Sequence, residues 1–594
     1  MSQVQVTLDV TRPQTHLVRV TLRLPAAPGK ERTLLMPAWV PGSYKIRDFG
    51  RNVQNLTATV AGKPAKVQHP TKDSWVVRAD GEAVTLQYAV YARELAVQES
   101  HVTADHAHLF PATMVLYDAH SRGLPHKLTV RRPKGWSLWS GLETARLDGT
   151  LAVATDFDHL IDCPVECGPA SDYQVRRFMV RGKPHRHVVW RAPAGVDWTR
   201  VDRDMAAIVK ETVALWGEAP YPHYTFLSLV AVDGGGGLEH RNSTVLGVDP
   251  SHLLAEEKLV TRFLPLVAHE FFHTWNVKRI LPAAFQPYPL QREAYTDLLW
   301  LFEGFTSYYE IPLLHRAKVV EPEAWTKIVA EDLEAYHKAL GRRRISVAEA
   351  SRLTWTLLYQ PHEHNVNRNV SYYTKGMWVG LCLDAELRRR GVQDGLDAVM
   401  RHLWRKHGKT GVGVTDDAFP DVVEQATGVN LRAKLAAWTQ GTEELPLVAS
   451  FKVLGLDLIA DWKDPKKRLG LGLEFKPGGS VIARLWEDRP AAVVLQPDDE
   501  VVAALGYKWN AEAFAERVAA KKPGEVVEMA VFREGRLRAF QVPLSEAPKE
   551  KFTLKPRKGA AATRARKAWL GEGRPSSGKA PSGPAKPRGR HTRY

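Results

Sequence analysis

Apolar and polar residues alternate along the first part of the chain. The alternation has a period of two, is interrupted by Pro, Gly and Asp, and covers residues 3–10, 16–24, 55–60, 74–79 and 83–90. This pattern is typical of strands with one face on a core and the other in water. It predicts an N-terminal β domain over residues 1–170, built as a sandwich or an open sheet.

The pattern changes to a helical period in the middle of the chain. Two strand-like runs, 186–192 and 224–232, give way to long apolar runs with helical spacing at residues 259–277, 293–317, 376–391 and 395–407. Strands followed by a set of helices indicate a mixed α+β domain. We predict such a domain, with a helical half, over residues 171–447.

Short strand-like runs return towards the C-terminus, around one helical stretch at 510–520. They predict a third domain over residues 448–547. Residues 548–594 are mostly Gly, Pro, Ser, Lys and Arg, with one isolated aromatic-apolar pair, Trp569 and Leu570. Because this composition buries too little surface to offset the entropy of ordering, we predict a disordered basic tail.

The positive charge of the chain is concentrated in this tail. The net charge is +16, of which residues 548–594 carry +12, since they hold fourteen Lys or Arg and two Glu. Free polycationic segments bind polyanions without sequence preference through counterion release. We expect the tail either to contact polyanions in this way or to be solvated without a partner.

Cysteine content and the start of the chain favour a cytoplasmic location. Cys163, Cys167 and Cys382 are too few for a disulfide framework and suit a reducing compartment. No run approaches the ~20 apolar residues that cross a bilayer. The first residues also lack the basic head and apolar block of a signal peptide. We expect neither a membrane span nor a signal peptide.

The strongest chemical motif lies in the apolar run at 259–277. His269 and His273 are four positions apart, so on a helix their side chains lie about 40° apart and can reach one ion. Glu270 can act as a base over the open position of that ion. The alternative is a polar rim on an amphipathic helix, but Phe271 and its apolar neighbours leave little of such a rim. Groups of this kind enter a buried helix only with partners, which favours a metal site.

A catalytic zinc usually takes three protein ligands and keeps one position for water. Glu303 is the best third ligand, because it is a lone carboxylate within the apolar run at 293–317. A buried, unpaired Glu is costly, so a positive partner must neutralise it. A helix, a loop and an antiparallel helix would return Glu303 to the ion held by His269 and His273. We expect one Zn²⁺ per chain.

These segments carry a family resemblance. HEFFHTWNVKRI and LWLFEGFTSYY, which contain the three ligands, resemble the glycyl aminopeptidase family of zinc metallopeptidases, which is related to thermolysin and aminopeptidase N. Residues 37–53 are similar to the N-terminal domain of that family, and residues 162–168 resemble its D-S-P-V-E-x-G segment, with Cys163 where Ser is usual. The resemblance covers residues 1–545. It implies a thermolysin-like catalytic domain and a C-terminal PDZ-like domain.

Four glycines precede Glu239 and His240, about thirty residues before the histidine pair. A flexible turn is one interpretation. The other is a substrate site, in which Gly236 and Gly237 let a substrate backbone approach closely. GGLEH resembles the G-x-M-E-N segment of zinc aminopeptidases, which implies that Glu239 binds the N-terminus of the substrate.

Tyr373 is the candidate oxyanion donor. The sequence Y-x-K-G at 373–376 resembles the aminopeptidase Y-E-K-G, whose tyrosine hydroxyl binds the developing oxyanion. An aromatic turn packed beneath a helix is the structural alternative. Tyr372 is adjacent and stays an alternative donor.

The segment at 468–473, RLGLGL, resembles the G-L-G-F loop with which PDZ domains hold a terminal carboxylate. The third domain is therefore expected to bind the C-terminus of a peptide, or to serve as a rigid cover. His106 and His108 would share a strand face, but no third ligand is apparent, and we expect ordinary structural or surface histidines.

Together these features predict a zinc aminopeptidase with Glu270 as general base and Tyr373 as oxyanion donor. Its substrates would be peptides with a free N-terminus, and the resemblance implies small first residues, Gly or Ala. A zinc endopeptidase is the main alternative within the enzyme class. A non-catalytic, peptide-binding PDZ scaffold and a nucleic-acid-associated protein that acts through its tail are the alternatives outside it.

Overall fold

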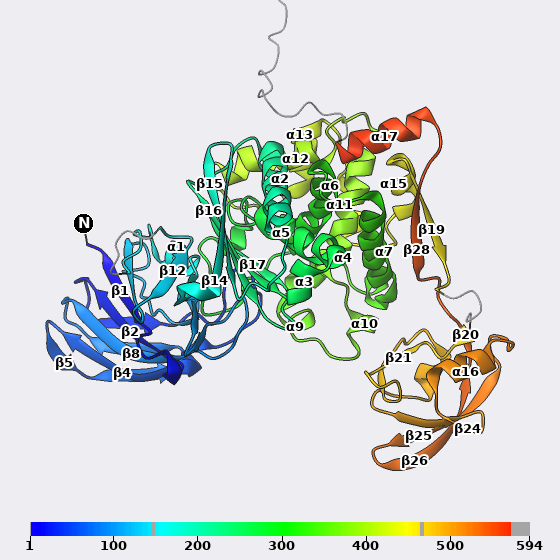
Figure 1. Ribbon diagram of the computed structural model, residues 1–594, viewed down its shortest axis with the longest axis horizontal. Coiled ribbons are helices and arrows are strands. Elements are labelled where there is room, and N and C mark those ends of the chain that lie inside the picture. Colours follow the sequence, from blue (N-terminus) through cyan, green and yellow to red (C-terminus); the bar gives the residue numbers. More distant parts are fainter. Residues whose placement is uncertain (1, 144–148, 464–468, 572–594) are drawn as a thin grey trace, which may run out of the picture.

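The computed structural model describes residues 2–143, 149–463 and 469–571 of the 594-residue chain. A β-rich body lies at one end, a largely helical body lies in the middle, and a small β unit lies at the other end (Figure 1). The prediction of a multidomain α+β protein with an N-terminal β part and a helical region is confirmed.

The N-terminal body contains a six-stranded sheet that is antiparallel except for one edge pair. Its strands, in spatial order, are β11 (His126–Arg131), β1 (Val4–Asp9), β2 (Leu17–Leu24), β8 (Val84–Tyr91), β4 (Val53–Val60) and β5 (Lys63–Ala65). Strand β1 pairs with β11 in parallel. The period-two pattern appears directly in β2, where Val18, Val20, Leu22 and Leu24 are buried and alternate with more exposed residues.

Two smaller sheets complete this body. They are β3 (Glu31–Leu35), β7 (Ser74–Arg78) and β6 (Val67–Thr71), and β12 (Trp136–Ser140), β13 (Val165–Pro169), β10 (His106–Leu109) and β9 (His101–Thr103). His106 and His108 on β10 are buried and both contact Glu166 on β13, at 2.9 Å and 2.5 Å. The short helix α1 (Phe157–Ile161) leads into β13.

The middle body begins with a five-stranded sheet. Its order is β14 (Tyr173–Val180), β15 (Lys183–Trp190), β16 (Tyr224–Val230), β18 (Ser243–Val248) and β17 (Gly237–Glu239). The three central strands are parallel, whereas β14 and the short edge strand β17 are antiparallel to their neighbours. Because β16 and β18 are buried throughout, they read as apolar runs rather than as alternation.

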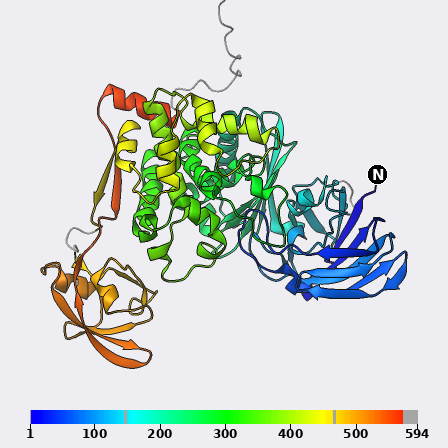
Figure 2. The same cartoon turned by 180° about the vertical axis from the view of Figure 1, so that it is seen from behind.

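Helices follow the sheet and form the rest of the middle body (Figure 2). Those nearest the site are α2 (Trp198–Trp216), the π-helical turn η5 (Leu259–Phe263) with α5 (Leu264–Phe272), the π-helical turn η7 (Trp300–Gly304) with α6 (Phe305–Arg316), and α11 (Tyr372–Arg389). The others are α3 (Pro250–Leu254), α4 (Glu256–Lys258), α7 (Pro322–Lys338), α8 (Val347–Arg352), α9 (Thr354–Leu357), α10 (Asn365–Arg368), α12 (Leu396–Leu403), α13 (Phe419–Thr427), α14 (Arg432–Thr439) and α15 (Leu447–Val453).

One of these helices is shorter than the apolar run at 293–317 predicts. The helical structure starts only at η7, because hydrogen bonds to Asp416 hold the preceding residues. Its Oδ1 accepts hydrogen bonds from Thr296 Oγ1 at 2.7 Å and from the backbone N–H of Asp297 at 3.1 Å.

The small C-terminal unit has a core of its own, formed by residues between Leu469 and Leu544. Its elements are β20 (Leu469–Gly470), β21 (Leu473–Phe475), β22 (Ile482–Leu485), β23 (Glu500–Ala504), β24 (Tyr507–Lys508), α16 (Ala511–Val518), β25 (Val526–Arg533), β26 (Arg536–Pro543) and β27 (Ser545–Glu546). Helix α16 lies within the predicted helical stretch at 510–520.

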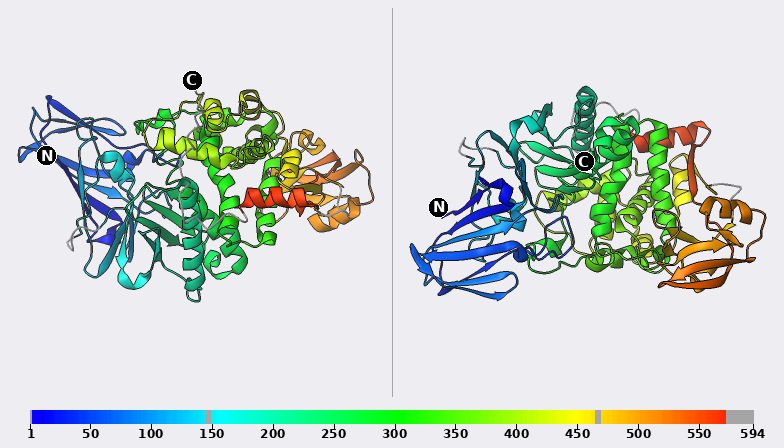
Figure 3. Two further views of the ribbon diagram at one scale, coloured as in Figure 1. Left: turned by 90° about the horizontal axis from the view of Figure 1, so that it is seen from above. Right: turned by 60° about the horizontal axis from the view of Figure 1, so that its bottom comes forward.

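The predicted disordered tail is wrong over its first part. Strand β28 (Lys551–Pro556) pairs antiparallel with β19 (Leu456–Asp461), and helix α17 (Ala560–Leu570) lies against the helical body (Figure 3). Trp569 and Leu570 are buried, and Trp569 Nε1 donates a hydrogen bond to Tyr308 Oη at 2.8 Å. The apolar pair thus has a partner surface on α6. Residues 572–594 lie outside the described residues.

The boundary predicted at residue 448 is displaced for the same reason. Apolar residues of α15, β19, β28 and α17 belong to the core of the middle body, not to that of the small unit. The chain therefore leaves the middle body along β19, forms the small unit and returns along β28. Among the described residues, no helix has both the length and the apolar character needed to cross a membrane.

Candidate metal centre and substrate site

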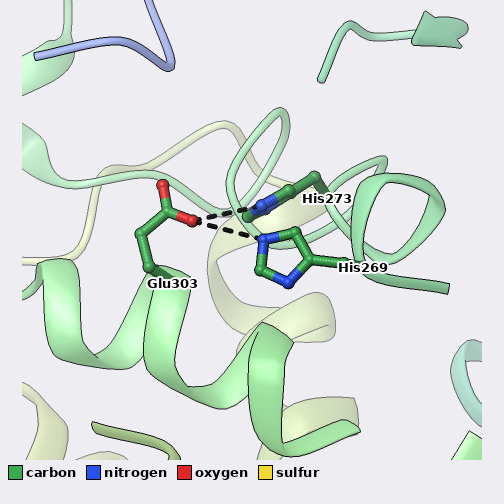
Figure 4. A group of neighbouring side chains, drawn as sticks. All are labelled: His269, His273 and Glu303. Carbon is green, nitrogen blue, oxygen red and sulfur yellow. Dashed lines mark ion pairs between the residues drawn. The ribbon is translucent and has the colours of Figure 1, made fainter. Parts of the chain in front are cut away.

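Three predicted ligands converge at the centre of the middle body. His269 and His273 lie at the C-terminal end of α5, and Glu303 lies in η7 (Figure 4). Glu303 Oε2 is 3.2 Å from His273 Nε2 and 3.7 Å from His269 Nε2. Ligand atoms that share a tetrahedral zinc at about 2.1 Å lie roughly 3.4 Å apart, so this separation fits one ion.

The outer atoms of the same side chains are already engaged. His273 Nδ1 donates to the carbonyl oxygen of Asn276 at 2.7 Å, and His269 Nδ1 lies 2.8 Å from Glu310 Oε1. Partners of this kind fix the ring orientation and leave each Nε2 free to bind a metal. Glu303 Oε2 is buried and receives no hydrogen bond from the described residues, as expected of an atom that faces an ion.

Two close contacts between helices position Glu303 beside α11. A Cβ on Gly304 would lie 2.4 Å from Gly376 Cα, and a Cβ on Gly376 would lie 2.5 Å from the carbonyl oxygen of Trp300. Only glycine fits at both positions. This packing brings η7 against the first turn of α11, which carries Tyr373.

Glu270 is buried beside the ligand cluster. Its burial raises its pKa to about 7, an effect that the neighbouring His269 and His273 oppose. No described residue donates a hydrogen bond to Glu270 Oε2. Gly237 packs against this side chain, since a Cβ there would lie 2.4 Å from Glu270 Cδ. A carboxylate with a pKa near neutrality is suited to proton transfer at physiological pH.

Glu239 ends the edge strand β17 and lies beside the same cluster. Ligand atoms of Glu239, Glu270 and His273 all lie within 4.8 Å of one another. Burial raises the pKa of Glu239, while the positive charges of His273 and Lys278 oppose the rise. Glu239 Oε1 is buried, and none of the residues 2–143, 149–463 and 469–571 donates to it. Glu239 Oε1 is therefore a hydrogen-bond acceptor in the site to which no described residue donates.

Gly236 lies farther out than Gly237. Its φ is +74°, and its carbonyl oxygen accepts a hydrogen bond from the N–H of Gly247 at 2.9 Å, so it shapes the turn between β16 and β17. The structure thus brings Gly237 into the site and places Gly236 at its edge.

The two adjacent tyrosines differ in their surroundings. The ring of Tyr373 is half-buried and stacks beside His269, with 6.2 Å between ring centroids. Tyr372 is fully buried, and its hydroxyl accepts a hydrogen bond from Thr354 Oγ1 at 3.1 Å. Tyr373 is therefore the tyrosine that adjoins the metal ligands, whereas the hydroxyl of Tyr372 is held in the core.

Sequence reasoning missed two groups around the site. Asp162 lies 2.7 Å from Lys278 Nζ and 3.1 Å from His240 Nδ1, and it also accepts the backbone N–H of Arg241. This acid joins the 162–168 segment to the residues after Glu239. The resemblance of residues 162–168 to the family segment already singled out Asp162. It did not show which residues this acid contacts.

The second missed group is Tyr44, which comes from the N-terminal body. Its hydroxyl lies 3.4 Å from Glu303 Oε1, the carboxylate oxygen that does not face the histidines. Tyr44 lies within the quoted 37–53 segment, but that segment carries no sign of a contact 259 residues away.

Two histidines four apart on a helix, a carboxylate from a second helix and a buried glutamate beside them define the H-E-x-x-H class of zinc peptidases. Residues 5–169 match the family model of the Peptidase M61 N-terminal domain, and residues 262–379 match that of the M61 glycyl aminopeptidase. These matches confirm the resemblance to the glycyl aminopeptidase family and, with the geometry of the site, identify the chain as a zinc peptidase. The comparison with curated proteins returned no match.

Similar proteins are also found among solved structures. An aminopeptidase N family protein from Idiomarina loihiensis is 29% identical, with a TM-score of 0.89 over 96% of this chain and 100% of that one. An M1 zinc metallopeptidase from Deinococcus radiodurans is 16% identical, with a TM-score of 0.48 over 75% of this chain and 95% of that one. Yeast LTA4 hydrolase in complex with bestatin is 14% identical, with a TM-score of 0.47 over 75% and 68%.

Proposed function

We propose that this protein is a zinc aminopeptidase that hydrolyses the first peptide bond of peptides with a small N-terminal residue, Gly or Ala. The observation that carries this proposal is Glu239, a buried carboxylate beside the three-ligand cluster, whose Oε1 accepts no hydrogen bond from the part of the chain that the structure describes. A free α-ammonium supplies the missing charge and the missing hydrogen bonds.

In this proposal His269, His273 and Glu303 hold zinc, which when bound supplies a Lewis acid for the scissile carbonyl and lowers the pKa of a water molecule. Glu270 takes the proton of the attacking water as the water oxygen bonds to the carbonyl carbon. The same carboxyl then gives the proton to the leaving nitrogen as the carbon–nitrogen bond breaks. Tyr373 donates a hydrogen bond to the tetrahedral oxyanion.

The backbone around Glu239 favours an exopeptidase over an endopeptidase. Gly42 lies directly against this carboxylate: a Cβ there would be 2.6 Å from Glu239 Oε2 and 2.7 Å from Oε1. The backbone turn at Gly42 therefore packs against the carboxylate. An endopeptidase needs room beside this carboxylate for the residues that precede the scissile bond, and the turn occupies part of that room.

The decisive experiment compares free and blocked substrates. Purified protein should cleave glycyl and alanyl p-nitroanilides, and a chelator should abolish the activity until zinc is restored. A peptide with an acetylated N-terminus should be cleaved far more slowly than the same peptide with a free N-terminus. Equal rates on blocked and free peptides would contradict the aminopeptidase assignment, and metal-free protein with full activity would contradict the zinc mechanism.

Two finer proposals concern the other parts of the chain. The small C-terminal unit is PDZ-like and holds the C-terminal carboxylate of a peptide in a pocket of about 280 Å³ lined by Gly470, Gly472 and Arg489, together with Lys338 of the middle body. Titration with a peptide acid and with its amide tests this, since only the acid should bind. A cytoplasmic location is supported by the three cysteines, which are buried free thiols.

A further inference from the structure

A loop from the N-terminal body enters the peptidase site. It runs from Val40 to Arg47, and it turns at Gly42, whose φ of +98° favours glycine. Beyond this turn, Tyr44 is 1% exposed although it lies outside the middle body in sequence. The site is thus completed by two domains.

Tyr44 lies close to both the proposed substrate anchor and a metal ligand. Its hydroxyl is 3.4 Å from Glu303 Oε1, and the backbone two residues earlier, at Gly42, contacts the Glu239 carboxylate. The negative charges of Glu303 and Glu239, after burial, are the main causes that raise the pKa of Tyr44, which agrees with a position near both.

Aromatic neighbours hold this ring in place from three sides. It stacks on Phe285 with 5.8 Å between ring centroids, and it meets Trp355 and Tyr359 edge-on at 6.0 Å each. Side chains packed in this way cannot move aside without losing these contacts. The ring is a fixed wall rather than a lid.

The loop is also fastened at its base. Arg47 Nη2 donates to Ser43 Oγ at 2.9 Å, and Arg47 pairs with Glu99 at 3.3 Å. The preceding residue Trp39 donates from Nε1 to the carbonyl oxygen of Pro289 at 3.0 Å. The loop is therefore anchored to both domains.

This wall limits the space at the first substrate residue. A substrate whose α-ammonium binds Glu239 and whose first carbonyl faces the metal ligands has only its Cα between them. The side chain on that Cα must share the space with the Tyr44 ring. We infer that Tyr44 is the specificity-determining residue that restricts the N-terminal residue to Gly or Ala. This inference rests on the proposed aminopeptidase function.

A pocket of about 450 Å³ lies near the loop. It is lined in part by Pro41 and by Phe285, on which the Tyr44 ring stacks. Because the ring is buried and held by its neighbours, its removal should leave room for a larger first residue.

The test is the selectivity ratio, the kcat/KM for leucyl p-nitroanilide divided by that for glycyl p-nitroanilide. In Tyr44→Ala this ratio should rise at least tenfold. In Tyr44→Phe it should stay within twofold of wild type, because the ring is kept and only the hydroxyl is lost. Tyr44→Leu, which keeps an apolar side chain in the core, should be intermediate and serves if Tyr44→Ala does not fold.

Tyr117→Ala is the matched control. Tyr117 is also a buried tyrosine of the N-terminal body that contacts the middle body, through a 2.7 Å hydrogen bond to Gln291. It lies outside the site, so the ratio should not change in this variant even if stability falls. A rise equal to that of Tyr44→Ala would show general loosening of the interface and overturn the inference.

The remaining outcomes separate the two proposals. If folded, zinc-loaded Tyr44→Ala and Tyr44→Leu keep the wild-type ratio, the inference on Tyr44 is wrong and the aminopeptidase function stands. If the wild-type protein cleaves neither amide, the proposed function itself fails. Inhibition by free leucine and free glycine gives a second readout: leucine should gain affinity in Tyr44→Ala and glycine should not.

Discussion

At the scale of single residues, the buried carboxylate of Glu270 combines a raised pKa with an oxygen that no described residue donates to. We expect Glu270→Gln to keep the zinc and to lose turnover by about 10²–10⁴-fold, because the change removes the base and no ligand. Metal analysis alongside kinetics checks this. His273→Ala is the contrasting variant, since it should lose both zinc and activity. A Glu270→Gln protein that turns over at the wild-type rate would exclude Glu270 as the base.

Tyr373 supports a prediction about the oxyanion. Tyr373→Phe should lower kcat by about 10²–10³-fold on glycyl p-nitroanilide with little change in KM, because the hydroxyl acts in the transition state. Tyr372→Phe is the matched control. Its hydroxyl bonds Thr354 in the core, so its loss should lower the melting temperature slightly and leave kcat unchanged. The reverse pattern would move the assignment to Tyr372.

Glu239 supports a third prediction. Glu239→Ala should raise KM and lower kcat together on glycyl p-nitroanilide, because the lost carboxylate both binds and orients the substrate. Removal of the α-amino group from the substrate should cause a similar loss in wild type. The two losses should be strongly non-additive, since each removes one partner of the same ion pair. Fully additive losses would show that the ammonium binds elsewhere.

The clustering of His269, His273 and Glu303 could be predicted from sequence because the signals are local. The spacing of four fixes the histidine pair, and a lone acid in an apolar run must have a partner. Tyr44 and Asp162 could not be placed in the same way. Their contacts join the N-terminal body to the middle body, and such long-range packing leaves no period or spacing in the chain.

At the scale of elements, helix α7 carries an acid that makes stability depend on pH. Burial raises the pKa of Asp332 to about 7, with the charges of Glu310 and Glu331 adding to the rise. The neutral form is therefore favoured in the folded state. The stability contributed by this group is present below its unfolded pKa near 4 and is lost as the pH rises through about 7.

Asp332→Asn should accordingly gain stability over wild type as the pH rises, by about 1–2 kcal/mol at pH 8 after allowance for solvent screening. Thermal unfolding at pH 4 and pH 8 checks this, with the two proteins nearly equal at pH 4. Asp421→Asn is the control, because Asp421 is exposed and pairs with Arg432 on the surface. A constant difference between wild type and Asp332→Asn at both pH values would contradict the ionisation argument.

Secondary structure could be predicted where period and length were clear, as in β2, α5 and α11. The segment after residue 550 could not. Its composition resembles a solvated tail, and what orders it is a partner surface: Trp569 bonds Tyr308, 261 residues earlier in the chain. A short basic helix is stable there only because tertiary packing supports it.

At the scale of the whole molecule, helix α17 is part of the structure that stabilises the catalytic body. Trp569→Ala should lower the free energy of unfolding by about 3–5 kcal/mol, because it removes a fully buried indole that contacts Tyr308 and Trp325. Arg564→Ala on the same helix is the control, since Arg564 is exposed. Chemical denaturation of both variants checks this. Equal stability of the two variants would show that α17 does not stabilise the catalytic body.

Chains truncated after residue 558 and after residue 571 give a complementary comparison. They differ by α17 alone, so the shorter chain should melt at the lower temperature. Equal melting temperatures would contradict a stabilising role for the helix.

The antiparallel pair β19 and β28 has a consequence for how the molecule is divided. Asp461 and Lys551 are direct partners in this pair, so the chain leaves the body and re-enters it at one point. In topological terms the small C-terminal unit is a large insertion in the loop of the β19–β28 hairpin. The length of this insertion does not affect the path of the chain through the helices. Joining residues 461 and 551 by a two-residue turn should excise the unit without opening a gap in the parent protein. The same junction would accept an unrelated domain whose termini lie close together.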